Sequence, residues 1–138
     1  MFKTICLALD GSENSKSAIG VAAELAEAGG AKIVLAHVVE LVAGKGGVVP
    51  VRIEDAIEAE LEEQLEALRE RGIEAELEIT ENILGGPARG VLEIAERVGA
   101  DLIVCATRGH TALGGLLLGS VAARLVQLAE RPVLVVPS

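Results

Sequence analysis

The chain has 138 residues, of which 51% are hydrophobic, so it can bury a core as one domain over residues 1–138, and a disordered polypeptide is excluded. It holds no Trp or Tyr and a single Phe, so the core must be aliphatic, and the stacking rings of a single-stranded nucleic-acid platform are missing. The formal net charge of −9 repels nucleic-acid backbones, although it permits one local phosphate site built from backbone N–H groups.

Neither a signal peptide nor a membrane span is expected. The chain starts with one Lys and a strand-like run, and no apolar stretch reaches the roughly 18 residues that a transmembrane helix needs. Cys6 and Cys105 lie in apolar runs without C-x-x-C spacing, so both are expected to be buried, reduced thiols that form at best a poor redox pair. These features predict a cytoplasmic protein.

The first half of the chain predicts two buried strands around one helix. Lys3–Leu9 is an apolar run that ends in the turn Asp10-Gly11-Ser12, and Ser12 is expected to cap the helix that follows. Gly29-Gly30 ends that helix, and Ala31–Val39 is the second buried strand. Residues 40–51 lose all periodicity and are rich in glycine, which predicts a mobile surface loop.

The second half predicts three helices that alternate with three strands. The first of these helices begins with acidic residues and ends with Arg69 and Arg71, as the helix dipole favours. The strand after it alternates apolar residues with Glu, which is typical of a half-exposed strand at the edge of a sheet. The predicted elements are Ile53–Arg71, Ile73–Ile79, a helix from Pro87 that ends at Gly99, Asp101–Ala106, Gly119–Glu130 and Pro132–Val136.

Strand and helix alternate without a linker or an internal repeat. This order predicts an α/β fold: a five-stranded, mainly parallel sheet with four helices in a doubly wound, Rossmann-like three-layer sandwich. Ligands of such sheets bind beyond the carboxyl ends of the strands, where the strand order reverses. The first strand is the expected reversal point, so Asp10, the segment after Val38 and the loop after Ala106 should surround one crevice.

The loop from Thr107 to Gly119 is rich in glycine and leads into a helix that starts at Gly119-Ser120. The unpaired N–H groups of a helix N-terminus suit phosphate, and glycine lets the backbone approach it. The alternative is a flexible connection with a serine cap. Arg108 and His110 lie in this loop, where they either reach phosphate oxygens or are merely solvated.

Two further polar residues fall near the same crevice. Asp10 can accept hydrogen bonds from ribose hydroxyls, or it can cap the helix that starts near Ser12. His37, near the end of the second strand, is expected to be a hydrogen-bonded structural residue. Neither a P-loop nor a dinucleotide fingerprint occurs in the sequence, and two His without clustered Cys make a zinc site improbable.

Six segments follow one another over nearly the whole chain: Leu9-Asp10-Gly11-Ser12, His37-Val38-Val39, Ala100–Val104, Thr107-Arg108-Gly109, Leu117–Val121 and Arg131–Val136. Together, in this order, they resemble the universal stress protein family. The nucleotide-binding branch of this family carries the motif G-x2-G-x9-G-[ST]. Gly109, nine further residues and Gly119-Ser120 match it, whereas its first glycine falls on Ala106, where a Cβ or an unsuitable backbone angle would disturb the site. The hydroxyl that often follows Val121 in the family is replaced by Ala122.

The resemblance implies a nucleotide site, a dimer and a function. Ala8 and Asp10 would border adenine and ribose, and Val38 would pack on the adenine. The residues expected to hold the phosphates are Arg108, Gly109, Gly119, Ser120 and Val121. The site would be completed by Leu9, Cys105, Ala106 and Ala122. The family also implies a homodimer through the final strand, residues 132–136, whose apolar edge would seek a partner.

The sequence therefore predicts a small stress-response protein that binds ATP, with Mg²⁺ as a candidate companion ion, and acts as a sensor or adaptor. No activated nucleophile or acid–base pair stands out, so a dedicated enzyme is not expected, and any ATP hydrolysis would be slow. The alternative is a dimeric interaction module that does not bind ATP. Neither nucleic acid nor a membrane is an expected partner.

Overall fold

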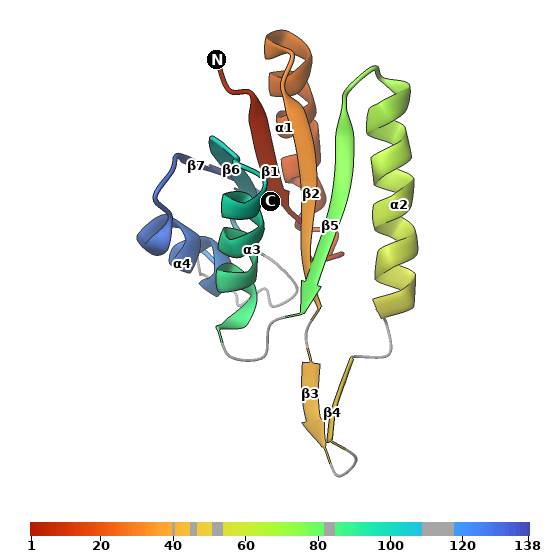
Figure 1. Ribbon diagram of the computed structural model, residues 1–138, viewed down its shortest axis with the longest axis vertical. Helices are drawn as coiled ribbons and strands as arrows, with labels where there is room; N and C mark the ends of the chain where they lie inside the picture. Colours follow the sequence, from red (N-terminus) through yellow and green to blue (C-terminus); the bar gives the residue numbers. More distant parts are fainter. Residues whose placement is uncertain (40, 45–46, 51–53, 82–84, 109–117) are drawn as a thin grey trace.

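The computed structural model describes residues 1–39, 41–44, 47–50, 54–81, 85–108 and 118–138 (Figure 1). Parallel strands form a five-stranded sheet in the order β5-β2-β1-β6-β7. These strands are β1 (Thr4–Ala8), β2 (Lys32–Val39), β5 (Ala75–Glu81), β6 (Leu102–Ala106) and β7 (Val133–Val136). The described helices are α1 (Lys16–Gly29), α2 (Glu54–Glu70), α3 (Gly86–Arg97) and α4 (Ser120–Leu128). The predicted fold is confirmed, as is the position of the third predicted strand at an edge.

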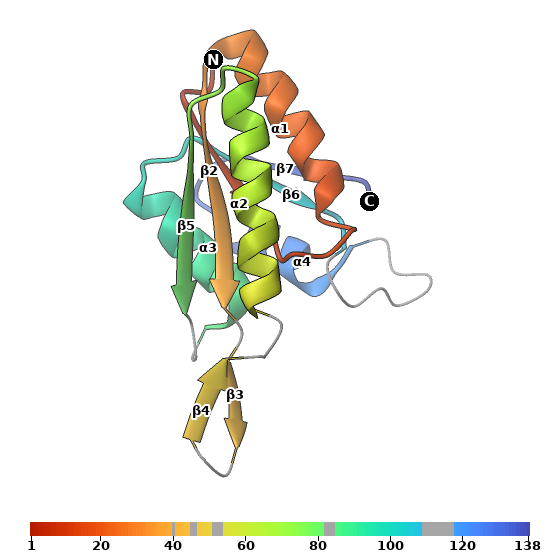
Figure 2. The ribbon, with the colours of Figure 1, turned by 90° about the vertical axis from the view of Figure 1, so that its right-hand side faces the viewer.

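Helices α1 and α2 cover one face of the sheet, and α3 and α4 cover the other (Figure 1 and Figure 2). Side chains alternate along each strand: Ile5 and Leu7 pack with α1 and α2, whereas Cys6 and Ala8 pack with α3 and α4. A strand covered on both faces must be apolar at every position, which is why these strands can be recognised in the sequence. None of the described helices is both long and apolar enough to cross a bilayer.

Strand β1 lies in the middle of the sheet, between β2 and β6. Its register pairs Ala8 with Ala36 of β2 and Leu7 with Val104 of β6. From β1 the chain winds outward through β2 to β5, and it then returns to the other side to form β6 and β7. The strand order therefore reverses at β1, as predicted, and the carboxyl ends of β1, β2 and β6 meet at the same edge.

The prediction of a loop over residues 40–51 is wrong. Strand β3 (Leu41–Gly44) pairs antiparallel with β4 (Gly47–Pro50), from Leu41↔Pro50 to Gly44↔Gly47. The two-stranded ribbon projects away from the main sheet beyond the carboxyl end of β2 (Figure 1 and Figure 2). The physical reason lies in two short apolar runs, Leu41-Val42-Ala43 and Val48-Val49, which favour strands, on either side of a glycine-rich reversal.

The third predicted strand starts two residues late in the structure, at Ala75 instead of Ile73. Gly72 has a φ of 82°, in the left-handed region, and ends α2. The Ile73 N–H then donates to the Leu68 carbonyl at 3.2 Å. Ile73 is therefore part of the helix cap, and its buried side chain continues the apolar pattern without belonging to the strand.

Candidate functional site

A cleft of about 290 Å³ opens where the carboxyl ends of β1, β2 and β6 meet. Every predicted site residue lines it except Gly109, which lies outside the described residues, as does His110. The predicted residues in the lining are Ala8, Leu9, Asp10, Val38, Cys105, Ala106, Arg108, Gly119, Ser120, Val121 and Ala122. The structure thus brings together segments that are more than a hundred residues apart in the sequence.

One wall of the cleft is apolar. It is formed by Ala8, Val38 and Cys105 at the strand ends, and by Val91 of α3 and Ala122 of α4. All five are buried side chains of the same hydrophobic cluster. A flat, apolar group such as a nucleobase can pack against such a wall without exposing it to water.

The close approach of α3 to β2 sets the position of Val38 in this wall. Gly90 of α3 faces Val38, and a Cβ at Gly90 would lie 2.5 Å from Cγ2 and 3.0 Å from Cγ1 of that valine. The absence of a side chain at Gly90 is therefore what lets the helix reach the strand at the site.

The other end of the cleft holds the N-terminus of α4. Gly119 is the N-cap residue, with an extended backbone, and its N–H donates to the Thr107 carbonyl at 2.5 Å. The Ala123 N–H donates to the Gly119 carbonyl at 3.0 Å, which closes the first turn of the helix. The preceding N–H groups, from Ser120 to Ala122, have no acceptor in an earlier turn, and these residues line the cleft together with Arg108. This end therefore suits an anion.

The alternative of a serine cap on this helix is wrong. The cap residue is Gly119, which has no side chain to contribute, and Ser120 is already the first helical residue, with its side chain exposed. The Ser120 hydroxyl is therefore placed at the cleft rather than used to end the helix.

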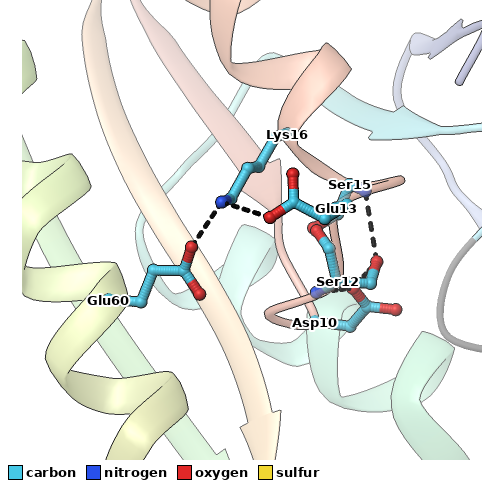
Figure 3. Close-up of polar contacts among 6 residues, drawn as sticks. All are labelled: Asp10, Ser12, Glu13, Ser15, Lys16 and Glu60. Carbon is cyan, nitrogen blue, oxygen red and sulfur yellow. Dashed lines mark hydrogen bonds and ion pairs between the residues drawn. The ribbon is translucent and has the colours of Figure 1, made fainter.

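Asp10 lies at the mouth of the cleft, where a hydrogen-bonded turn holds its carboxylate (Figure 3). Its Oδ1 accepts from the Ser12 N–H at 2.9 Å and from the Ser12 hydroxyl at 2.5 Å. The Ser12 Oγ in turn accepts from the Ser15 N–H at 3.2 Å, and the Ser15 hydroxyl donates to the Ser12 carbonyl at 2.9 Å.

This turn corrects the predicted start of the first helix. Helix α1 begins at Lys16 with Ser15 as the N-cap residue, and neither Ser12 nor Asp10 caps it. The Ser12 hydroxyl donates to the Asp10 carboxylate and the Ser15 hydroxyl donates to the Ser12 carbonyl, because short polar side chains compete with the helix for local hydrogen bonds. The turn also needs Gly11, whose φ is 83°; a Cβ there would lie 2.8 Å from the Ile57 side chain of α2.

Lys16 joins this turn to α2 (Figure 3). Its Nζ lies 2.8 Å from Glu13 Oε1 and 2.5 Å from Glu60 Oε1. The hydrogen bonds to Glu13 and Glu60 raise the pKa of Lys16 above its ordinary value, against the opposing effect of desolvation. The side chain thus stays charged and links α1 to α2 next to the cleft.

His37 is hydrogen-bonded and buried, as predicted. Its Nδ1 lies 2.9 Å from the Leu9 carbonyl oxygen, and its Nε2 lies 3.0 Å from Oε1 of Glu54. The ring also lines the cleft, near which the sequence placed it, but the sequence did not indicate that Glu54 would be its partner.

Other lining residues were missed: Ser15, Pro87, Val91 and Thr107. For Pro87 and Val91 of α3 a signal was available in the sequence, because Pro87 marks the start of a helix that follows a strand. Helices that cover one face of a parallel sheet run antiparallel to its strands, so their N-termini point to the carboxyl ends of the strands.

Contrary to the expectation, Ala106 does not disturb the backbone. No described residue other than glycine has a positive φ, and Ala106 pairs with Val136 as an ordinary strand residue. Its side chain belongs to the cluster under α1 and α2, whereas Cys105 and Ala122 belong to the opposite cluster. The extra methyl group therefore lies on the face of the sheet away from α4.

Both cysteines are free, buried thiols, as predicted. Burial raises the pKa of Cys6 to about 12, with a smaller opposing effect of Arg131, and raises the pKa of Cys105 to about 11. Cys105 lines the cleft, but as a neutral thiol it contributes apolar surface and not a nucleophile.

Comparison with known proteins gives this cleft a family context. The model of the universal stress protein family matches residues 1–137. A universal stress protein from Thermus aquaticus is 39% identical over 140 residues, covering 99% of each chain. A universal stress protein solved in complex with cAMP is 26% identical, with a TM-score of 0.70 over 99% of this chain and 97% of that one. The universal stress protein from Archaeoglobus fulgidus in complex with dAMP is 24% identical, with a TM-score of 0.69 over 99% of this chain and 98% of that one. This chain belongs to the universal stress protein family.

Proposed function

We propose that this universal stress protein binds an adenine nucleotide, with ATP as the favoured ligand, and acts as a sensor or adaptor rather than as a dedicated enzyme. The observation that carries the proposal is a single cleft with an apolar wall, a fixed carboxylate and a helix N-terminus. The family members complexed with cAMP and dAMP support an adenine nucleotide in particular.

The three parts of the cleft match the three parts of a nucleotide. The base would pack between Ala8 and Val38, and the Asp10 carboxylate would accept hydrogen bonds from the ribose hydroxyls. The phosphates would lie at the N-terminus of α4, where the Ser120 and Val121 amides and the helix dipole favour negative charge. These contacts rely mainly on backbone groups and on apolar surface.

A Mg²⁺ ion would arrive with the ATP. Among the residues that the structure describes, no three His, Cys, Asp or Glu side chains gather as a metal site. Mg²⁺ in nucleotide sites is commonly held by phosphate oxygens, waters and one or two carboxylates. In this cleft the phosphate oxygens and waters would hold it, because Asp10, the carboxylate in the described lining, is assigned to the ribose.

The melting temperature of the purified, nucleotide-free protein tests the proposal. A ligand at about 100 times its Kd adds roughly 2.7 kcal/mol to the free energy of unfolding, which is an easily measured shift. We expect millimolar Mg-ATP to raise the melting temperature, and AMP to raise it less because it lacks two phosphates. GTP is the control for the base. No shift with any adenine nucleotide would refute the proposal.

Two substitutions locate the site. Gly119→Val puts a branched side chain at the cap of α4 and should abolish nucleotide binding without unfolding the protein, because it blocks the approach of phosphate to the backbone. Gly20→Val, at an exposed position of α1 with open space around it, is the matched control and should bind normally. Equal affinities in both variants would mean that the phosphates bind elsewhere.

Ala106→Gly tests whether the altered motif matters. Because the Ala106 methyl packs under α1 and α2, its removal should destabilise the protein by about 0.5–1 kcal/mol and leave the nucleotide affinity unchanged. A large gain in affinity would instead mean that the methyl group obstructs the ligand.

The second candidate function is a dimeric interaction module, with residues 132–136 as the interface. Strand β7 forms an edge of the sheet, and Leu134 on it is 36% exposed. An unpaired apolar edge strand favours pairing with a second copy. Sedimentation analysis should find a dimer that Leu134→Glu weakens. A dimer without any nucleotide-dependent stabilisation would favour this function over ATP binding, and phosphate release under saturating ATP would separate both from a slow ATPase.

A further inference from the structure

The His37 ring is held between two acceptors. It is only 3% exposed, and its Nδ1 lies 2.9 Å from the Leu9 carbonyl oxygen. Its Nε2 lies 3.0 Å from both carboxylate oxygens of Glu54, the first residue of α2. A carbonyl oxygen can only accept a hydrogen bond, so Nδ1 must carry a proton.

The second acceptor faces the other ring nitrogen. A proton between Nε2 and the Glu54 carboxyl group completes this contact, because two buried acceptors that face each other without one are unfavourable. The ring is therefore hydrogen-bonded at both nitrogens, to Leu9 and to Glu54.

The ring fixes the residue that precedes Asp10. The Leu9 N–H donates to the Ala36 carbonyl at 3.0 Å, and the Leu9 carbonyl accepts from His37. Both backbone groups of Leu9 are thus attached to β2. On the other side of Asp10, the turn formed with Ser12 holds the carboxylate. The direction in which Asp10 enters the cleft therefore depends on the ring of His37.

We propose that Glu54, which does not line the cleft, is a positioning residue for the nucleotide site. Its carboxyl group holds the His37 ring at Nε2, and the ring holds Leu9 through Nδ1, which places Asp10 at the ribose end of the cleft. The role in ligand affinity rests on the proposed function, whereas the role in ordering Leu9 and Asp10 does not.

The first test uses the ligand-free protein and compares the His37 ring of wild type with that of Glu54→Ala by NMR. We expect the ring N–H protons to exchange with solvent more slowly in wild type, because Glu54 holds the ring at Nε2 and Leu9 holds it at Nδ1. Equal exchange of the ring protons in the two proteins would overturn the proposal.

The second test uses Glu54→Ala, with exposed Glu63→Ala of α2 as the matched control. Amide hydrogen exchange of Leu9 and Ser12 in the ligand-free protein should speed up in Glu54→Ala and stay unchanged in Glu63→Ala. Unchanged exchange in Glu54→Ala would refute the positioning role. Glu54→Gln keeps a hydrogen-bonding partner for the ring, so it should restore slow exchange.

The affinity for Mg-ATP gives the third readout. Glu54→Ala should weaken binding about tenfold, because it removes the hydrogen bond that holds the His37 ring and, through Leu9, the Asp10 carboxylate. Glu54→Gln should bind nearly as tightly as wild type, because its side-chain amide can still hydrogen-bond to the ring. Equal affinity in wild type and Glu54→Ala would overturn the link to the ligand. If wild type binds no adenine nucleotide, the proposed function fails, and the exchange of the ring protons and of the backbone amides still decides whether Glu54 and His37 hold Leu9 in place.

Discussion

The substitution Gly90→Ala probes the contact that brings α3 to the cleft. A Cβ at Gly90 would lie 2.5 Å from Cγ2 and 3.0 Å from Cγ1 of Val38. Carbon atoms pack best at about 3.5–4.0 Å, so either the helix or the valine must move by about 1 Å. Rotation of Val38 gives little relief, because one methyl group replaces the other and the side chain is stiff at χ1.

Two terms of opposite sign decide the effect on stability. Overpacking of a core contact costs about 1–3 kcal/mol, whereas replacement of glycine by alanine inside a helix gains about 0.5–1 kcal/mol. Gly20→Ala in α1 has the same intrinsic gain and no neighbour within 4 Å, so it isolates that term. The two variants should therefore differ in free energy of unfolding by about 1–3 kcal/mol, with Gly90→Ala the less stable.

Chemical denaturation of the two variants measures this difference. If the clash with Val38 is the cause, the double variant Gly90→Ala/Val38→Ala should be less destabilised than the sum of its single changes, with a coupling of roughly 0.5–3 kcal/mol. Nucleotide affinity should also fall in Gly90→Ala, since Val38 lines the cleft, and stay constant in Gly20→Ala. Equal stabilities of Gly90→Ala and Gly20→Ala would refute the reasoning.

Three further predictions follow from contacts around the sheet. Burial opposes ionisation of Asp101, but N–H donors from Lys3 and Thr4 outweigh it and hold the pKa of its carboxyl below the ordinary value. Asp101 thus stabilises the fold above about pH 4, and this contribution is lost as the pH falls through the lowered pKa. The difference in free energy of unfolding between wild type and Asp101→Asn should therefore shrink as the pH falls, whereas the difference between wild type and Glu63→Gln should not. Arg131→Ala should cost about 1–3 kcal/mol in urea denaturation, because Nη1 donates to the Ala95 and Ala100 carbonyls at 2.8 and 3.0 Å, and Arg131→Lys should recover part of the loss. Ser138→Ala removes contacts to Thr107 and to the Arg108 N–H; it should weaken Mg-ATP binding a few-fold in calorimetry and change stability by less than about 0.5 kcal/mol, whereas Ser17→Ala should leave binding unchanged.

The parts of the fold that were predictable are those specified by neighbouring residues in the chain. The strands read as apolar runs because both faces of the sheet are covered. Their alternation with helices then restricts the topology to a parallel sheet that reverses at the first strand, and this reversal places the cleft. Most of the cleft lining follows from that single step.

The features that could not be predicted depend on competition between neighbouring polar side chains or on contacts between residues far apart in the sequence. Ser12, Asn14 and Ser15 can all cap a helix, and Ser12 is excluded only because its N–H and hydroxyl donate to the Asp10 carboxylate. Glu54 is 17 residues from His37, with the β3–β4 ribbon between them, so no spacing in the sequence connects the two. The β3–β4 ribbon was missed because a high glycine content was taken to indicate a loop. Glycines that lie between two apolar runs can instead form the turn of a hairpin.

Gly90 shows that a further signal was present but unused. An isolated glycine inside a helical pattern weakens the helix, so it usually has a packing reason. Here the reason is the approach of α3 to β2 at Val38, one of the residues that the resemblance had assigned to the adenine. A glycine at the site-facing side of a helix was thus as informative as the glycines of the loop.

Ala106 shows that a departure from a sequence motif need not change the chemistry of the site. A motif glycine is indispensable where φ is positive or where a Cβ would touch the ligand. At Ala106 the backbone is an ordinary strand, and its methyl packs on the face opposite α4. At Ala122 a hydroxyl is missing, but the N–H groups at the start of α4 do not depend on side chains. If a nucleotide binds here, backbone groups carry most of the recognition, and the altered positions are those where the side chain contributes least.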